Sequence, residues 1–171
     1  QESFGVEVAT TGDPQEGYDV GTTTIPEGDT INIAGAESLV NIIHKVSMSV
    51  SVNGLSADKT VKGNLVVTDK NGTDFTQSQM DKLVFTTSSG NLIKDGILNA
   101  RIKLWKVQQN VKVKVGTYGT AAPGYRVSEV KVTPEMISVA GDEETLQELN
   151  GELSLAEMIS VDGISESFTS D

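Results

Sequence analysis

Two stretches of the chain carry one pattern: residues 17–43 read GYDVGTTTIPEGDTINIAGAESLVNII, and residues 124–149 read GYRVSEVKVTPEMISVAGDEETLQEL. Matched residues in and just beyond them keep a spacing of 106 to 109 positions. These residues are Gly17 and Gly124, Tyr18 and Tyr125, Gly35 and Gly141, and Gly54 and Gly163. A repeat of this length is typical of duplicated domains and not of a solenoid of short units. The sequence therefore predicts two homologous domains, residues 1–107 and residues 108–171.

Apolar alternation predicts that both copies are mainly β. In residues 5–11, Val6 and Val8 alternate with Glu7, and residues 111–117 repeat this alternation. A period of two residues is typical of a half-buried strand. The other shared strands are expected at residues 18–25 and 125–132, at residues 30–34 and 136–140, and at residues 46–52 and 158–161.

One short helix is expected in each copy, directly after Gly35 and after Gly141. There the apolar period changes from two to about 3.6 residues, which places the apolar side chains on one helical face. These side chains are Leu39, Val40 and Ile43 in the first copy and Leu146 and Leu149 in the second. Asp142 stands at the N-cap position of the second helix, where its carboxylate can accept a backbone hydrogen bond.

A matching turn follows the fourth shared strand of each copy. The dipeptides Asn53-Gly54 and Asp162-Gly163 occupy these positions. Asn-Gly and Asp-Gly are strong signals for a type I′ hairpin turn, because both central residues of that turn need a positive φ. The sequence therefore predicts the same hairpin turn in both copies.

The two copies differ beyond this turn. The first continues through strands expected at residues 60–68, 73–76, 83–87 and 97–107, with a turn at residues 69–72 and a polar linking segment at residues 77–82. Residues 61–107 have no counterpart in the second copy, which reaches Asp171 first. We therefore expect the second domain to lack its C-terminal strands and to expose an unpaired edge, unless another chain fills that edge.

The junction between the copies contains no flexible linker. Residues 101–115 alternate almost without a break, and only residues 108–110 interrupt the pattern. Gly/Ser-rich linkers behave as flexible coils, and no such segment stands here. The sequence predicts a semi-rigid, elongated pair of domains.

Composition excludes several classes of function. The formal net charge is −11, which repels nucleic-acid phosphates, so nucleic acid is not expected as a partner. The absence of cysteine excludes disulfides and thiolate chemistry. No apolar run approaches the roughly 18 residues that a membrane-spanning helix needs, so we expect no direct membrane insertion by this segment.

The polar clusters do not predict a catalytic, metal or cofactor site. His44 is the only histidine, and we expect it to be exposed at the end of the first helix. The cluster of Asp69, Asn71, Gly72 and Asp74 has calcium-type oxygen ligands but not the spacing of a known loop, so a hairpin turn is the preferred interpretation. The acidic residues of the second helix fit a solvated face.

The aromatic residues leave one binding hypothesis open. Trp105 is the only tryptophan, and either packing at the domain junction or stacking on a sugar would suit it. Tyr18 and Tyr125 hold equivalent positions, so we expect both rings to be buried with their hydroxyls bonded to backbone.

The order of these elements, present twice, resembles the YbbR domain family. The second copy carries the pattern over residues 110–169, in VKVKVGTYGTAAPGYRVSEVKVTPEMISVAGDEETLQEL followed by VDGISESFT. The first copy is similar to the family more loosely over residues 4–107, where DKNGTDF looks like a late hairpin.

The resemblance implies small, β-dominated domains with one short helix each, similar to a domain found in relatives of one ribosomal protein. YbbR domains typically occur in tandem outside the bacterial cytoplasmic membrane, behind a membrane helix that this sequence lacks. The family implies a non-catalytic role without cofactors, with a membrane-bound diadenylate cyclase, which makes cyclic di-AMP, as the partner of a longer parent protein. The alternative is a cell-surface module for glycan or cell wall that uses Trp105. The oligomeric state stays open.

Overall fold

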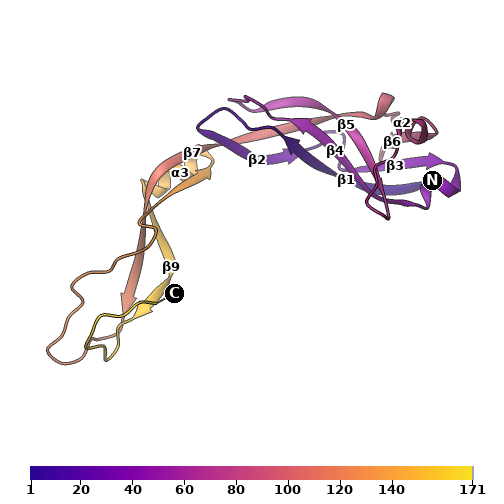
Figure 1. Ribbon diagram of the computed structural model, residues 1–171. Helices are drawn as coiled ribbons and strands as arrows, with labels where there is room; N and C mark the ends of the chain where they lie inside the picture. Colours follow the sequence, from indigo (N-terminus) through magenta and orange to yellow (C-terminus); the bar gives the residue numbers. More distant parts are fainter. Residues whose placement is uncertain (171) are drawn as a thin grey trace. The chain divides into compact units, whose positions relative to one another are not determined.

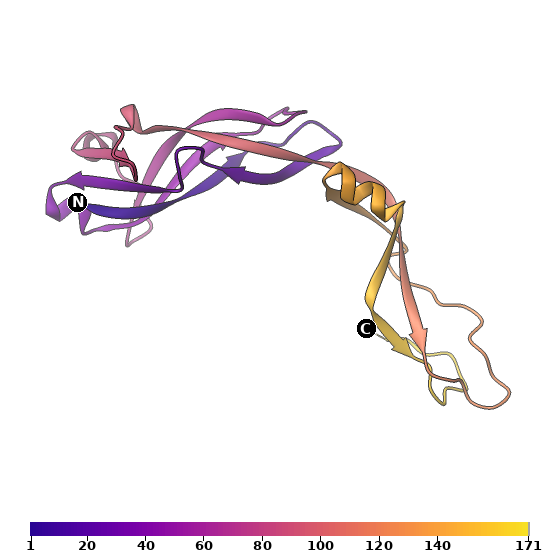
Figure 2. The same cartoon turned by 180° about the vertical axis from the view of Figure 1, so that it is seen from behind.

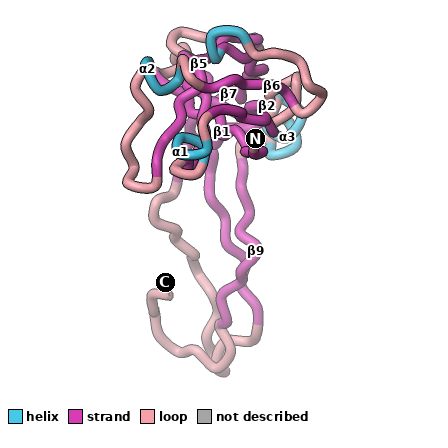
Figure 3. The backbone as a smooth tube through the Cα atoms, turned by 90° about the vertical axis from the view of Figure 1, so that its right-hand side faces the viewer, coloured by secondary structure: helices cyan, strands magenta, loops and turns pink. Residues whose placement is uncertain are grey.

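The computed structural model describes residues 1–170, and the chain divides into two compact units, Gln1–Trp105 and Lys106–Asp171. We call these the first unit and the second unit. Strands dominate the described residues and the helices are short (Figure 3). The predicted mainly β fold is therefore confirmed.

The first unit contains most of the secondary structure (Figure 1). Its elements are β1 (Glu2–Thr11), β2 (Tyr18–Thr24), β3 (Thr30–Gly35), α1 (Glu37–Val40), β4 (Ile43–Ser51), β5 (Lys59–Asp69), α2 (Gln77–Met80), β6 (Leu83–Thr87) and the 3-10 turn η1 (Lys94–Gly96). The long strand β7 (Ile97–Tyr118) contributes its first residues to this unit. The strands follow the order β2-β7-β5-β4-β1-β3-β6.

The core of the first unit comes from the alternation of its strands. Nineteen apolar residues form one buried cluster. Along β4, for example, Val46, Met48 and Val50 are each at most 1% exposed, while Ser47 and Ser49 between them are half-buried. β1 and β4 are parallel, and β5 pairs with the other edge of β4 in antiparallel fashion. Both edges of β4 are therefore occupied.

The second unit is smaller and has a thinner core. After the second part of β7 come β8 (Met136–Gly141), α3 (Glu143–Leu149) and β9 (Glu152–Ser160). β8 pairs with β7 in antiparallel fashion, and β9 pairs with β7 in parallel. The buried apolar residues in the described part of this unit are Val111, Val113, Leu146 and Val161.

The two units share a three-stranded pattern with one register. In the first unit β1 lies between antiparallel β3 and parallel β4, and in the second unit β7 lies between antiparallel β8 and parallel β9. The matched antiparallel pairs are Phe4–Ile31 with Val111–Ile137 and Gly5–Thr30 with Lys112–Met136. The matched parallel pairs are Val6–Val46 with Val113–Leu153 and Thr10–Val50 with Thr117–Ile159. By pairing and register, β9 is the counterpart of β4.

The turns after β4 and β9 also use the same backbone hydrogen bonds. The Gly54 N–H donates to the Asp13 carbonyl over 2.8 Å, and the Gly163 N–H donates to the Thr120 carbonyl over 2.8 Å. Only the glycine of each turn has a positive φ, +68° at Gly54 and +70° at Gly163. The predicted type I′ geometry is therefore wrong, because it needs a positive φ at Asn53 and Asp162 as well.

Two further positions, Gly12 and Gly119, require glycine because a residue of the later turn lies close to their backbone. A Cβ at Gly12 would lie 2.9 Å from Asn53 Cβ, and a Cβ at Gly119 would lie 2.9 Å from Asp162 Cβ. Both glycines also have a positive φ, +76° and +93°. Each copy therefore needs glycine where the end of its first strand meets the later turn.

Several predicted elements differ from the structure. The expected first helix is only α1, which ends at Val40, so that Ile43 and His44 belong to β4 and not to a helix. Exposed His44 therefore has no helix-ending role. The segment at residues 77–82 contains α2, which begins with a capping box between Thr76 and Gln79. The interruption expected at residues 108–110 does not end β7, although Asn110 has a φ of +58° and the pairing with β8 shifts nearby.

Residues 125–132 do not form the predicted strand. In the first unit the corresponding strand, β2, is hydrogen-bonded to β7. Within residues 106–170 no strand lies in the matching place beyond β9. A strand needs a neighbour for its backbone groups, so the apolar alternation of residues 125–132 is not sufficient by itself.

Candidate interaction surface

The outer edge of β9 has no strand partner among the described residues. Within residues 1–170, β9 pairs only with β7, whereas its counterpart β4 pairs with β1 on one side and β5 on the other. Figures 1 and 2 show β9 beside the final part of β7 with no strand along its other edge. Such an edge presents a row of backbone donors and acceptors that a further strand can use.

The side chains of β9 are also uncovered. On β4, Val46 and Val50 are each 1% exposed. Their counterparts by register, Leu153 and Ile159, are only half-buried. Leu155 and Met158 are 43% and 53% exposed. The apolar side chains of β9 therefore lie where a covering layer would bury them.

The loop between β7 and β8 adds further exposed apolar surface. Tyr125, Val127 and Val130 are 59%, 45% and 41% exposed. The Tyr125 N–H donates to the Ala122 carbonyl over 2.9 Å, as the Tyr18 N–H donates to Gln15 over 3.0 Å. The two copies therefore share the backbone turn at Gly17 and Gly124, although the exposure of the tyrosine side chain that follows it differs.

The two tyrosine rings, both predicted to be buried, differ in burial. Tyr18 is half-buried and packs against the core of the first unit. The ring of Tyr125 is mostly exposed, so the predicted burial is wrong at this residue. Tyr18 begins strand β2, and β2 has no equivalent among residues 106–170.

Acidic residues dominate the charge of the second unit. Its sequence holds five Lys and Arg residues against eleven Asp and Glu residues, a formal net charge of −6. Lys114 Nζ lies 2.6 Å from Glu152 Oε2 at the start of β9. The hydrogen bond from Lys114 lowers the pKa of Glu152 below its usual range. Glu157 on β9 is exposed and has no ion pair within residues 1–170.

The N-terminus of α3 confirms one predicted cap. The Asp142 carboxylate accepts a hydrogen bond from the Thr145 N–H over 2.8 Å. Leu146 faces inward, and Gly141 precedes the cap at the end of β8. A hollow of about 460 Å³ lies beside α3 and is bordered by Lys106, Gln147 and Gly151.

Trp105 packs within the first unit. Its side chain is half-buried, and a Cβ at Gly21 of β2 would lie 2.6 Å from the indole Nε1. The absence of a side chain at Gly21 therefore leaves space for the indole. This contact with β2 is not apparent from the strand alternation, and sugar stacking by Trp105 stays a prediction.

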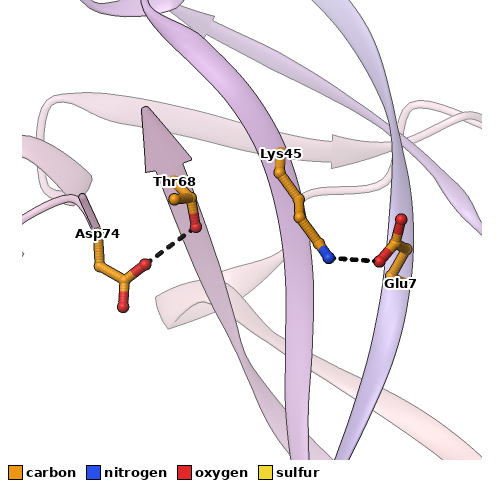
Figure 4. Close-up of polar contacts among 4 residues, drawn as sticks. All are labelled: Glu7, Lys45, Thr68 and Asp74. Carbon is orange, nitrogen blue, oxygen red and sulfur yellow. Dashed lines mark hydrogen bonds and ion pairs between the residues drawn. The ribbon is translucent and has the colours of Figure 1, made fainter. Parts of the chain in front are cut away.

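A groove of about 710 Å³ lies in the first unit beside α2. Apolar side chains from β5, α2, β6 and the loops before α2 and after β6 line it, among them Leu65, Phe75, Met80, Phe85 and Ile93. Asp74 at its rim accepts a hydrogen bond from the Thr68 hydroxyl over 2.9 Å (Figure 4). Figure 4 also shows Lys45 on β4 paired with Glu7 on β1, with Nζ 2.6 Å from Oε2.

The Asp69 cluster forms the predicted turn. The Gly72 N–H donates to the Asp69 carbonyl over 3.0 Å, and Asp69 Oδ1 accepts from the N–H groups of Thr73 and Asn71 over 2.9 Å and 2.8 Å. No group of three His, Cys, Asp or Glu residues within residues 1–170 is placed to hold a metal ion.

None of the helices within residues 1–170 is long and apolar enough to cross a membrane.

The Asp69 turn should lose stability in acid. The hydrogen bond from Thr73 N–H, followed by those from Asn71, holds the pKa of Asp69 below its usual range. A carboxyl whose pKa is lower in the folded state stabilises the fold above its unfolded pKa, and loses this effect as the pH falls through the folded pKa. We expect Asp69→Asn to remove this acid-dependent loosening of the turn, measured as amide exchange at Thr73 between pH 6 and pH 3. An unchanged pH profile in the variant would contradict the assignment.

Comparisons with known proteins give two similarities. Residues 4–80 match the family model described as YbbR-like protein. The match lies in the first unit, whereas the motif order had pointed to the second copy more strongly. Among solved structures, the chain is similar to a YbbR-like protein from Streptococcus pneumoniae TIGR4, with 9% sequence identity and a TM-score of 0.42. The alignment covers 61% of this chain and 47% of that chain, so it spans about half of the solved protein. No curated protein matches the chain.

Proposed function

Because residues 4–80 of this chain belong to the YbbR-like family, we propose that the chain is a non-catalytic module that binds another protein. In this proposal it acts outside the bacterial cytoplasm, as part of a longer parent protein held at the membrane by a separate segment. The partner is a membrane-bound diadenylate cyclase, whose synthesis of cyclic di-AMP the parent protein regulates. The partner and the location come from the family resemblance.

The observation that carries the proposal is the match of residues 4–80 to the YbbR-like family model. Exposed apolar side chains on β9 also favour a protein partner, since Leu155 and Met158 are 43% and 53% exposed. The formal net charge of −11 supports a protein partner over nucleic acid, because like charges repel phosphates.

The test uses the full-length parent protein in its host. We expect the parent to co-purify with the diadenylate cyclase and its deletion to change the cellular level of cyclic di-AMP. Leu155→Lys should weaken co-purification, because it places a charge among the exposed apolar side chains of β9. Leu92→Lys is the matched control, since Leu92 is 61% exposed in the first unit. No association, together with an unchanged cyclic di-AMP level after deletion, would refute the proposal.

A further inference from the structure

The groove beside α2 is lined by apolar side chains that differ in burial. Leu65, Phe85 and Ile93 belong to the core of the first unit and are each at most 6% exposed. Val84 and Leu92 line the same groove but are 51% and 61% exposed. Removing apolar surface from water is favourable in proportion to its area. Val84 and Leu92 are therefore side chains that a bound partner would stabilise by covering them.

The groove arises from the strand pairing of the first unit. β5 pairs with β7 only as far as Asn64, and residues 65–67 beyond that point line the groove. β6, at the end of the strand order, pairs with β3 and lines the groove with residues 83–85. Within residues 1–170 no pairing joins β5 to β6. All lining residues lie within residues 64–96, so the first unit forms the groove by itself.

The rim of the groove is acidic. Asp74, Asp81 and Asp95 line it together with a single cation, Lys94. The three aspartates are exposed, and none of them forms an ion pair within residues 1–170. The side chains that donate hydrogen bonds to Asp74 and Asp81 are a hydroxyl and an amide, which do not compensate the negative charge. Such a rim attracts cationic side chains and repels anionic ones.

The lining fits a peptide better than a small organic ligand. Pockets for small ligands orient them through a few polar groups placed within the apolar lining. In the described part of the chain Thr87 is the one buried polar residue, and it does not line the groove. The polar residues that do line it are all exposed, so apolar groups bind inside and charged groups at the edge, as in protein interfaces. A second copy of this chain is disfavoured, because it would bring a formal net charge of −11 to an acidic rim.

We propose that the groove beside α2 binds a short segment of another protein, in which apolar side chains are flanked by Lys or Arg. The apolar side chains of the segment cover Val84 and Leu92, and its cations face Asp74, Asp81 and Asp95. This site goes beyond the proposed function, since it lies in the first unit and does not depend on regulation of the cyclase.

The synthetic peptide KLLKLLK, labelled with a dye, is a direct probe of the groove. It is titrated into the whole chain, and fluorescence anisotropy gives the affinity, while hydrogen exchange locates the contact by amide protection. We expect saturable binding, slower exchange within residues 64–96 and weaker binding at higher salt. The matched peptides ELLELLE, with the charges reversed, and KSSKSSK, without apolar side chains, should each bind more weakly by about tenfold or more, the loss expected when a central contact is removed.

One pair of variants separates this site from the surface on β9. Leu92→Lys places a cation in the lining of the groove and should weaken peptide binding by about tenfold or more. Leu155→Lys lies in the second unit and should leave peptide binding unchanged. The expectation for co-purification with the cyclase is the reverse, so each proposal can fail without the other.

A second set of variants tests the charge of the rim. Replacing Asp74, Asp81 and Asp95 together by Asn removes the charge and keeps the fold, because the amide oxygen still accepts hydrogen bonds and Asn tolerates the φ of +54° at Asp95. We expect weaker binding and a smaller salt dependence. The control removes three exposed carboxylates from the second unit, by Glu135→Gln, Glu148→Gln and Glu157→Gln, and should change neither.

Five outcomes would overturn the inference. They are no saturable binding, equal binding of the three peptides, protection only outside residues 64–96, wild-type binding by the rim variant, and self-association of the chain that protects the groove without peptide. Urea unfolding identifies a variant that fails to fold, and the comparison of the three peptides on the wild-type chain then decides the question.

Discussion

Gly63→Val is expected to destabilise the first unit by about 3 kcal/mol or more, at the upper end of the range for overpacked cores. A Cβ at Gly63 would lie 2.5 Å from Met48 Cγ, 2.6 Å from Val50 Cγ1 and 2.7 Å from the Ser49 carbonyl oxygen. The first two atoms belong to buried side chains without free space, and the third belongs to the backbone of β4. The valine therefore forces β5 away from β4.

Urea unfolding followed by Trp105 fluorescence measures this effect, because the only tryptophan lies in the first unit. Lys62→Val is the matched control, since it adds valine to the neighbouring, exposed position of β5. We expect the control to change the free energy of unfolding by less than about 0.5 kcal/mol, the usual size of a surface effect. Equal unfolding midpoints for Gly63→Val and wild type would contradict the packing described here.

Met48→Ala is expected to cost about 2 to 5 kcal/mol of unfolding free energy in the first unit. Met48 is 0% exposed and lies on β4 between β1 and β5. Truncation removes its contacts and leaves a cavity, because strands paired on both edges cannot collapse freely into the space. The same fluorescence measurement applies, and a cost below about 1 kcal/mol would show that the site relaxes or that Met48 is less enclosed.

The two positions should also be coupled. In a double-mutant cycle, Met48→Ala removes the Cγ that a side chain at position 63 would meet at 2.5 Å. The combined loss from Gly63→Ala and Met48→Ala should therefore be smaller than the sum of the single losses by about 0.5 to 3 kcal/mol. Strict additivity would indicate that Val50 Cγ1 and the backbone oxygen of Ser49, and not Met48, limit the space at Gly63.

Local sequence signals predicted the elements that depend mainly on neighbours in the chain. Val6 and Val8 alternate in β1 as expected, and Asp142 caps α3 through the Thr145 N–H. The helix α2 carries an equally local signal, the Thr76 and Gln79 spacing of a capping box, which the polar composition of its segment concealed.

Elements that depend on distant partners were predicted less well. Residues 125–132 have the alternation of a strand but no neighbouring strand, so their backbone does not enter the sheet. The interruption at residues 108–110 looked like a break, yet β7 continues through it because β8 and β9 pair with the later part of the strand. In both cases tertiary pairing outweighs the local pattern.

The candidate surface follows in part from the sequence. The missing counterpart of residues 61–107 predicted an unpaired edge, but which strand carries it depends on the parallel pairing of β9 with β7. The groove beside α2 could not be predicted, because its lining residues, such as Leu65 and Ile93, come together only in the folded sheet. The contact of Trp105 with Gly21 is non-local for the same reason.

The unequal cores have a thermodynamic consequence. Nineteen buried apolar residues support the first unit, whereas the described part of the second has four. A unit with so few buried apolar residues has a small free energy of unfolding. A ligand present at a hundred times its Kd adds about 2.7 kcal/mol to the stability of the folded state, which is a large fraction of that small value. We therefore expect the melting temperature of the second unit to rise with ligand concentration, so that it reports how much ligand is bound. The melting temperature of the first unit should stay the same.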